Sequence, residues 1–361
     1  MRLLFVSDTH LGLDLPSRPR VERRRRGDDL LDALERALAP ALAGEVDAVL
    51  HGGDLHYRSR VPFWLARAAL EPLLRVASRG VPVLLVPGNH ERSRLPFPLL
   101  ALHERLHVFD RPRTFTLEAR GVRVAFSGFP YAPGVRDRFT ELVAAARGLA
   151  TGGEADVRVL CLHQCVEGAT CGPGNFTFRD GDDVVRRRDL PADVAAVLSG
   201  HVHRHQILRA PGLPSVVYAG SVERVGFAEV GEEKGAVRIV LERSGLASLE
   251  FLPHRVRPML VLRPRLEGLD AAGASAALRR AVSATPGDAV VQLRLEGTVP
   301  AAAEPALGAA SLRALGGGRT LSVSRRGGMA AWPLDPERGR GDGPRTVGRD
   351  GAGHAHGGVW H

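Results

Sequence analysis

Three histidines lie within five residues of the stretch LSGHVHRHQ (residues 198–206), directly after the apolar run DVAAVL. If a strand ends at this turn, side chains two positions apart, such as those of His201 and His203, can point to one spot beyond the sheet, where a cation could bind. The alternative is a solvent-exposed loop that happens to be rich in histidine. The stretch alone leaves both interpretations open.

Further side chains that can bind metal follow other apolar runs of the chain. They are Asp8 and His10 in SDTH, Asp54 in GGD, Asn89 and His90 in PGNHE, and His163 in LHQ, with His201 and His203 completing the set. These are ligand types that manganese, iron or zinc accepts. Because each follows a predicted strand, all can converge on one edge of a sheet. An isolated DTH or GNH occurs by chance in many chains, but this ordered succession predicts a dinuclear metal site.

Asp54 is the natural bridge between two such ions, because it is the only carboxylate beside Asn89, His163 and the late histidines. Two cations roughly 3.5 to 4 Å apart can share a hydroxide at neutral pH and clamp a phosphoryl group during in-line attack. The glycines of GGD and PGNHE would let the backbone turn tightly, so that the ligands point inward. Since adjacent side chains diverge, we expect His90 to face the bound phosphate and act as a general acid or charge stabiliser, not as a ligand.

The runs that precede these turns predict the elements that hold them. Buried strands are predicted at residues 2–7, 47–51, 81–86 and 157–162, and helices from Asp28 and from Pro62. This alternation predicts a layered α/β core. From about residue 206 to 252 short strands and turns follow one another without a helical stretch, which predicts antiparallel β structure.

The length of 361 residues suggests two or three domains. We expect a metal-binding domain at residues 1–255 and a small unit at 256–326, in which a β-α-β pattern is followed by a second helix and strand. Residues 327–361 are rich in glycine, proline and charge, and we expect them to form a disordered tail.

Composition limits the class of protein. No apolar run reaches the roughly 18 residues of a membrane span, and no signal peptide is evident, so we expect a cytoplasmic protein. Cys161, Cys165 and Cys171 are too few for a disulfide framework, and we expect them to be reduced. The formal net charge is +9, and of the 49 lysines and arginines only Lys234 is a lysine. Arginine suits phosphate, but a GC-rich genome also produces such a composition, so the charge favours a nucleic-acid partner only weakly.

A basic stretch, RPRVERRRRGDD at residues 18–29, follows the first ligand turn. One interpretation is that it grips the phosphate backbone of a nucleic acid beside the site, through Arg23, Arg24, Arg25 and Arg26. The other is a solvated loop before a helix that has Asp28 or Asp29 near its N-cap. The sequence supports both about equally.

The succession DTH, GGD, GNHE, LHQ and GHVH resembles the pattern of the calcineurin-like metallophosphoesterases. Within that superfamily the segments SDTHLG, VPGNHE, GHVHRHQ and YAGSVERVGFAEVGEEKG (residues 218–235) resemble SbcD-type DNA repair exonucleases. The resemblance covers about residues 1–255, and it implies a β-sandwich core flanked by helices. For residues 256–326 it implies only a small capping domain of α+β type that helps to shape the DNA-binding face.

The resemblance also implies which residue binds which ion. One metal would be held by Asp8, His10, Asp54 and His203, and the other by Asp54, Asn89, His163 and His201. His90 would stand beside the phosphate. The chain departs from the usual pattern after GGD, because His56 and Tyr57 stand where phenylalanine and histidine are usual, so the geometry at a DNA end can differ.

These features together predict a two-metal phosphodiesterase, an exonuclease or endonuclease acting on DNA, with Mn²⁺ as the expected cofactor and Fe or Zn as alternatives. An SbcC-like coiled-coil ATPase and a second copy of the chain are possible partners, although no pair of amphipathic helices for docking the ATPase is evident in the tail. One alternative is a phosphatase or cyclic-nucleotide phosphodiesterase with a closed, small pocket. Another is a DNA-binding accessory subunit without turnover, which the intact ligand set disfavours.

Overall fold

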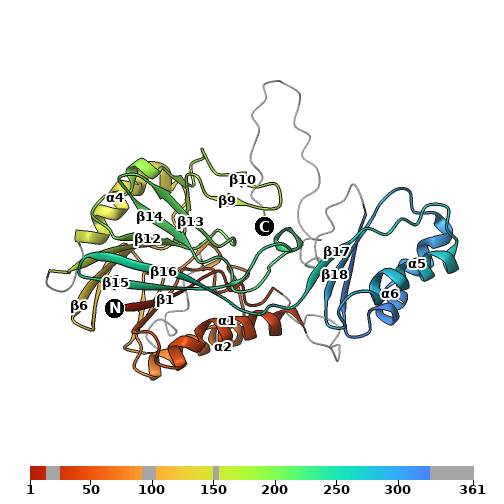
Figure 1. The fold of residues 1–361 in the computed structure, drawn as a ribbon, viewed down its shortest axis with the longest axis horizontal. Coiled ribbons are helices and arrows are strands. Elements are labelled where there is room, and N and C mark those ends of the chain that lie inside the picture. The colour runs from red at the N-terminus through yellow and green to blue at the C-terminus, as the bar shows by residue number, and fades with distance from the viewer. Residues whose placement is uncertain (14–24, 92–102, 149–153, 326–361) are drawn as a thin grey trace, which may run out of the picture.

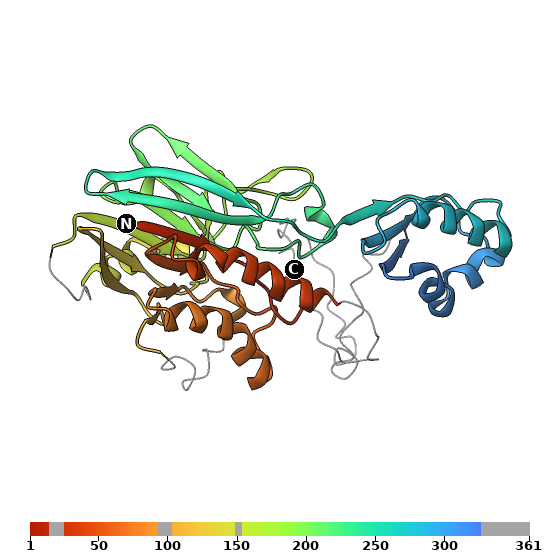
Figure 2. The ribbon, with the colours of Figure 1, turned by 60° about the horizontal axis from the view of Figure 1, so that its bottom comes forward.

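The computed structural model describes residues 1–13, 25–91, 103–148 and 154–325. Two six-stranded sheets pack face to face, and helices cover their outer faces, giving four layers in the order helix, sheet, sheet, helix (Figures 1 and 2). A smaller three-stranded sheet lies beyond one end of this sandwich. The predicted β-sandwich core flanked by helices is therefore confirmed.

The first sheet has the strand order β16-β15-β1-β2-β3-β4. Its strands are β1 (Arg2–Val6), β2 (Ala48–His51), β3 (Val83–Leu85), β4 (Leu106–Val108), β15 (Gly235–Glu242) and β16 (Gly245–Pro253). Strands β1 to β4 run parallel. Helix α1 (Arg26–Leu42) connects β1 to β2 and helix α2 (Phe63–Ser78) connects β2 to β3, so the carboxyl ends of these strands lie at one edge.

The second sheet has the order β13-β14-β12-β7-β6-β5. Its strands are β5 (Arg113–Ala119), β6 (Val122–Gly128), β7 (Val157–Leu162), β12 (Ala196–Ser199), β13 (Gln206–Ala210) and β14 (Leu213–Tyr218), and helix α4 (Val135–Gly148) covers its outer face. Strands β6, β7, β12 and β14 are parallel to one another. Short elements fill the connections: β8 (Cys165–Val166), β9 (Thr170–Cys171), β10 (Phe176–Thr177), β11 (Val184–Val185) and the 3-10 turns η1 (Asn89–Glu91), η2 (Arg187–Asp189) and η3 (Phe227–Glu229).

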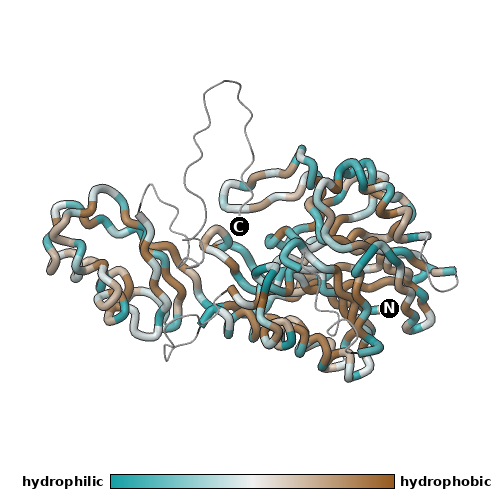
Figure 3. The backbone as a smooth tube through the Cα atoms, turned by 180° about the vertical axis from the view of Figure 1, so that it is seen from behind, coloured by the Kyte–Doolittle hydropathy of each residue, from teal (hydrophilic) through white to brown (hydrophobic). Residues whose placement is uncertain are grey.

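Strand β1 is buried on both of its faces, which explains why its sequence is almost entirely apolar. Leu3 and Phe5 point into the cluster between the two sheets, whereas Leu4 and Val6 point into the cluster beneath α1 and α2. A strand that is buried on both faces needs apolar residues at every position. Figure 3 shows apolar residues recurring along the strands of the sandwich.

The four strands predicted before the ligand turns are confirmed as β1, β2, β3 and β7, and the two predicted helices as α1 and α2. The prediction of antiparallel structure at 206–252 is only partly right. Strands β13 and β14 form one antiparallel pair, and β15 and β16 form another. The two pairs join different sheets, however, and β14 is parallel to β12.

The C-terminal unit contains β17 (Met259–Leu262), α5 (Ala271–Ser283), β18 (Val290–Leu295), the 3-10 turn η4 (Ala301–Leu307), α6 (Ala309–Gly316) and β19 (Thr320–Arg325). It has a hydrophobic cluster of its own. Its three strands are parallel and joined by helices, which agrees with the β-α-β pattern and the second helix and strand predicted from the residues. The connections are therefore of βαβ type, whereas the resemblance implied a domain of α+β type. The expected tail at 327–361 lies outside the described residues.

Four buried charges join this unit to the sandwich. Arg26 of α1 pairs with Asp29 at 2.8 Å and with Glu223 at 3.5 Å. Arg257, just before β17, pairs with the same Asp29 carboxylate at 3.2 Å and reaches the small sheet by a 3.0 Å hydrogen bond from its guanidinium to Thr320 Oγ1. The group holds two positive and two negative side chains, so its charges balance.

We expect Arg257→Met to destabilise the fold by about 3 to 5 kcal/mol, because it leaves two buried carboxylates with a single cation. Urea unfolding followed by far-UV circular dichroism measures this. Arg263→Met is the matched control, since Arg263 pairs with Glu296 on the exposed side of the same unit and should cost about 1 kcal/mol or less. Equal losses for the two variants would show that the buried group does not hold the units together.

Candidate metal centre

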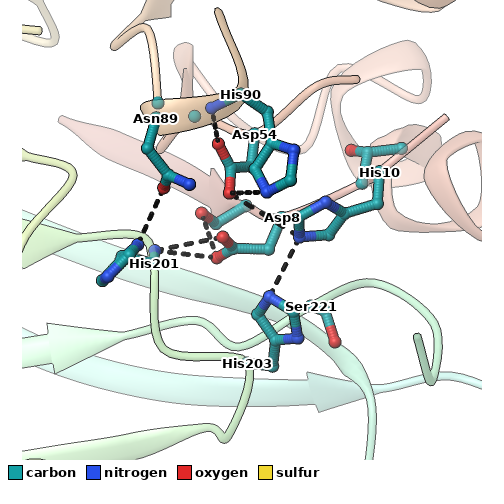
Figure 4. A network of polar contacts seen from close by, with 12 residues as sticks. Asp8, His10, Asp54, Asn89, His90, His201, His203 and Ser221 are labelled. Atoms are coloured by element: carbon teal, nitrogen blue, oxygen red, sulfur yellow. Dashed lines mark hydrogen bonds and ion pairs between the residues drawn. The ribbon is translucent and has the colours of Figure 1, made fainter. Parts of the chain in front are cut away.

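The side chains singled out in the sequence come together at the carboxyl ends of strands from both sheets. Loops after β1, β2 and β3 carry the residues of the first half of the chain, and loops after β7 and β12 carry those of the second half. The side chains brought together are Asp8, His10, Asp54, Asn89, His90, His163, His201 and His203. Figure 4 shows most of them converging on one spot between the two sheets.

The backbone is strained where it presents these ligands. Of the six non-glycine residues with positive φ in the described part of the chain, four are Asp8 (54°), His10 (52°), Asp54 (51°) and His201 (83°). Such a conformation costs on the order of 1 to 3 kcal/mol per residue and persists only where the surroundings enforce it. Two hydrogen bonds between the loops help to do so, from Asp8 N to Gly53 O at 3.0 Å and from His10 N to Asp54 O at 2.9 Å.

The glycines beside the ligands are needed for close approach. A Cβ atom on Gly53 would overlap the His163 ring, and one on Gly88 would overlap the Asp54 carboxylate. Of the glycines expected to make tight turns, Gly53 has a positive φ, at 106°. The others are required because the loops pack against one another, not because the chain turns in the left-handed region.

A first cluster consists of Asp8, His10 and His203, whose candidate ligand atoms all lie within 4.8 Å of one another. The Nε2 atoms of His10 and His203 lie only 2.9 Å apart, so the two rings point at a common spot. His203 is held from behind, because its Nδ1 lies 2.9 Å from the Glu229 carboxylate.

A second cluster consists of Asp54, His163 and His201. Asn89 joins it, since its Oδ1 lies 3.1 Å from His163 Nε2 and 3.0 Å from His201 Nδ1. His163 donates from Nδ1 to the carbonyl of Gly52 at 2.7 Å, which leaves Nε2 facing the centre. An imidazole fixed by its far nitrogen in this way is typical of a metal ligand.

The Asp54 carboxylate lies between the two clusters. Its Oδ2 is 3.4 Å from His163 Nε2 and 3.8 Å from His10 Nε2. Its Oδ1 accepts a hydrogen bond from the His90 amide at 3.0 Å. One carboxylate oxygen therefore faces imidazoles of both sets, which is the geometry expected of a bridging ligand.

His90 lies closer to Asp54 than the sequence argument implied. Asn89 and His90 belong to the 3-10 turn η1 instead of an extended segment. The Asn89 amide meets His163 and His201, whereas the His90 ring approaches Asp54. His90 Nε2 is 3.7 Å from Asp54 Oδ2, and its ring centroid is 5.1 Å from that of His10. His10, Asp54 and His90 also form a group that could hold an ion. His90 therefore lies within reach of an ion bound beside Asp54.

The protonation behaviour of the buried groups follows from burial and from each other's charges. Burial lowers the pKa of His10 well below its usual value and lowers that of His201 to about 3, which keeps both rings neutral and able to bind a cation. Burial opposes charge on His163 as well, but the Asp54 carboxylate outweighs it and raises the pKa of His163 to about 9. The pKa of Asp54 is well below its usual value because His163 outweighs the effect of burial.

Several residues of the site were not assigned roles from the sequence. Glu91 accepts hydrogen bonds from the amides of Asp54 and His56 at 2.9 Å and of Gly88 at 2.8 Å, so one buried carboxylate fixes two ligand loops. The Glu229 carboxylate contacts the Nδ1 atom of His203, and the Lys234 ammonium group contacts the same carboxylate. All three lie in motifs that the sequence displays, but nothing in a motif reveals which backbone amide or ring a side chain meets.

The aromatic rings around the site also depend on tertiary structure. Tyr57 flanks His10 and His90, with ring centroids 6.2 and 6.0 Å away, and Tyr131 flanks His201 at 5.7 Å. His205, the third histidine of the stretch LSGHVHRHQ, instead stacks on Phe251 at 4.1 Å.

The basic stretch divides between described and undescribed residues. Arg23 and Arg24 lie outside the described part. Arg25 precedes α1, and its amide donates to Asp28 at 3.0 Å, as in the interpretation that places an aspartate near the N-cap. Arg26 is buried, at 3% exposure, in the ion pairs with Asp29 and Glu223. It is therefore not available to contact a DNA phosphate, contrary to the phosphate-grip interpretation.

Two other expectations bear on the described residues. The three cysteines carry free thiols, and burial raises the pKa of Cys161 and Cys165. In the part of the chain that the structure covers, no helix combines the length and the apolar character that crossing a bilayer requires.

Curated relatives of the chain include two DNA double-strand break repair proteins named Mre11. The protein from Methanopyrus kandleri is 28% identical over 273 residues, covering 70% of this chain and 56% of the relative. The protein from Haloferax volcanii is 34% identical over 228 residues, covering 63% and 47%. A component of the nuclease SbcCD from Bacillus subtilis is 28% identical over 276 residues, covering 68% and 67%. The chain thus spans about half the length of the two Mre11 relatives.

A family model described as calcineurin-like phosphoesterase matches residues 1–205. The matched region is more than half of the chain and contains every side chain of the two clusters, from Asp8 to His203. The order of motifs, the β-sandwich and this match agree. The chain belongs to the calcineurin-like phosphoesterase family.

Proposed function

We propose that this protein is a two-metal phosphodiesterase that hydrolyses phosphodiester bonds of DNA. The observation that carries the proposal is the pair of ligand clusters that meet at the Asp54 carboxylate. The similarity to Mre11 proteins and to a component of the nuclease SbcCD supports DNA as the substrate. The formal net charge of +9 is in keeping with a polyanionic substrate.

The donor set fits divalent cations, because carboxylate, imidazole and amide groups converge and two of the rings are fixed through their far nitrogens. We assign Asp8, His10, Asp54 and His203 to one ion and Asp54, Asn89, His163 and His201 to the other, with Mn²⁺ as the proposed metal. Bound cations of this kind lower the pKa of water and offset the charge of a phosphate.

Other residues of the site would hold the ligands in place and supply hydrogen bonds or a proton to the substrate. Glu91 holds the loop amides, so that Asp54 keeps its place between the clusters. His90 is partly exposed and lies beside Asp54, where its Nε2 could donate a hydrogen bond or a proton to the phosphate or to the leaving oxygen. Tyr57 and Tyr131 flank the centre on the sides of the first and second clusters.

The proposal extends to partners and place of action. The Bacillus subtilis relative is named as one component of the nuclease SbcCD, and by analogy we propose that this chain works with an SbcC-like ATPase. A homodimer and a cytoplasmic location are further parts of the proposal. Co-purification with the product of an adjacent ATPase gene is the direct test of the partner.

We expect the purified protein with Mn²⁺ to degrade DNA from an end or internally, and to lose this activity on treatment with EDTA. The measurement compares a DNA duplex, a nucleoside monophosphate and a cyclic nucleotide under the same conditions. Preference for either small substrate would replace the DNA proposal with that of a phosphatase or cyclic-nucleotide phosphodiesterase. Tight DNA binding without turnover on any substrate would support an accessory role.

We expect Asp54→Ala to abolish activity and to lower the content of both ions, because both clusters share this carboxylate. His203→Ala should deplete one ion and largely spare the other. Elemental analysis of the two purified variants after Mn²⁺ loading measures the difference. Retention of two ions per chain by Asp54→Ala would refute the bridging role.

We expect His90→Asn to lower turnover by roughly 10² to 10⁴-fold while leaving the metal content unchanged, because a general acid or charge stabiliser contributes a factor of that size. Metal content, DNA binding and Mn²⁺-dependent hydrolysis should be measured on the same preparation. If metal and activity fall together, His90 is a ligand. Full activity in the variant would exclude the catalytic role.

A further inference from the structure

Of the 49 lysines and arginines in the chain, only Lys234 is a lysine, and it is 1% exposed. It belongs to the segment YAGSVERVGFAEVGEEKG at residues 218–235, in which the proposed chemistry so far gives a task to Glu229 alone. Within this segment, Ser221, Glu229 and Glu232 contact the Lys234 ammonium group. The ammonium group also contacts the backbone of His203. A buried amine needs strong partners to remain charged, so its contacts indicate its purpose.

Four oxygen atoms surround the Lys234 ammonium group. Nζ donates to the His203 carbonyl, to Ser221 Oγ and to Glu232 Oε2, each at 2.9 Å, and lies 2.7 Å from Glu229 Oε2. A compact ammonium fits such a closed cage of acceptors, whereas the planar guanidinium of arginine requires a wider, flat one. This difference gives a physical reason for a lysine in a chain that otherwise uses arginine.

Lys234 contacts two carboxylates, those of Glu229 and Glu232, but only one of them has another close cation. Glu232 is also paired with Arg204, whose Nε lies 3.1 Å from its carboxylate. Glu229 has Lys234 as its close cation and, through its other oxygen, faces His203 Nδ1 at 2.9 Å. Lys234 therefore stabilises the carboxylate that holds the His203 ring.

The ring of His203 is fixed by that contact. When Nδ1 donates its proton to Glu229, the lone pair of Nε2 is left facing His10 Nε2, 2.9 Å away, at the centre of the first cluster. A carboxylate behind a histidine sets both the tautomer and the angle of the ring, and loss of such a partner typically costs about 10 to 100-fold in metal affinity.

We propose that Lys234 is a positioning residue that acts through Glu229 to fix the imidazole of His203 for the first ion. The inference rests on the proposed two-ion site. It adds to that site a buried ammonium that touches neither ion nor substrate.

The test compares Lys234→Met, Glu229→Gln and their double variant with the wild-type chain. Arg238→Met is the matched control, because Arg238 lies on the strand that follows Lys234 and pairs with Glu250 at the surface. Isothermal titration with Mn²⁺ should show that Lys234→Met weakens one of the two ions by about 10 to 100-fold and leaves the other unchanged. The control should bind both ions as the wild type does.

The double variant Lys234→Met/Glu229→Gln tests whether Lys234 acts on His203 through Glu229. If Lys234 acts through Glu229, the double variant should bind Mn²⁺ no more weakly than the weaker single variant. Additive losses would overturn the route, and unchanged binding in Lys234→Met would overturn the proposal as a whole.

A second measurement does not depend on metal. In the metal-free protein, a protected Nδ1 proton resonance, assigned to His203 by its absence in His203→Asn, should disappear in Lys234→Met and persist in Arg238→Met. Persistence in Lys234→Met would refute the positioning role. If the wild type binds no Mn²⁺ at all, the proposed function fails, while this resonance still decides the role of Lys234.

Circular dichroism should confirm that each variant is folded. If Lys234→Met does not fold, the double variant Lys234→Gln/Glu232→Gln removes one charge of each sign and takes its place in both measurements. Loss of the His203 resonance in that variant supports the proposal, and its retention overturns it.

Discussion

The structure depends on a single buried carboxylate, Asp54, placed among imidazoles from both sheets. A carboxylate removed from water is stable only if positive or polar groups surround it closely. Here the ring of His163 lies 3.4 Å away and the amide of His90 3.0 Å away, and the rings of His10 and His90 lie within 4 Å. These groups arrive on three different loops, from both sheets. Groups carried by both sheets are therefore needed to accommodate the carboxylate in the folded protein.

That requirement explains the strain in the ligand loops. Left-handed backbone at Asp8, His10 and Asp54 aims their side chains inward, and it is maintained by the β1 and β2 loops bonding to each other and by Glu91 binding the amides of Asp54 and Gly88. The strain costs stability, but it prepares the ligand atoms before any ion arrives. Apolar packing on both faces of β1 supplies a rigid base for this arrangement.

Patterns along the chain were sufficient to predict the strands that precede the ligand turns, helices α1 and α2, and the residues that meet, because a buried strand followed by a polar turn is a local signal. Strands β4, β5 and β6 and helix α4 carry no such turn and were not predicted. Contacts across the fold were not predictable in the same way. Arg26 looked like a surface cation among its neighbours, yet its partner Glu223 is far away in sequence. His205 shares a stretch with His201 and His203 but stacks on Phe251 of β16. Likewise, the two hairpins between 206 and 252 share one pattern and join different sheets.

One segment connects the metal centre to the small C-terminal unit. Glu223 faces the buried charges at the junction, where it lies 3.5 Å from Arg26 and accepts a hydrogen bond from the Arg257 amide at 3.4 Å. Further along the same segment, Glu229 holds the ring of His203, and its Oε2 accepts from the amide of Val225 at 3.2 Å. The backbone that positions this histidine is therefore the same backbone that anchors the small unit. Static contacts within this one segment therefore run from the junction to a candidate metal ligand.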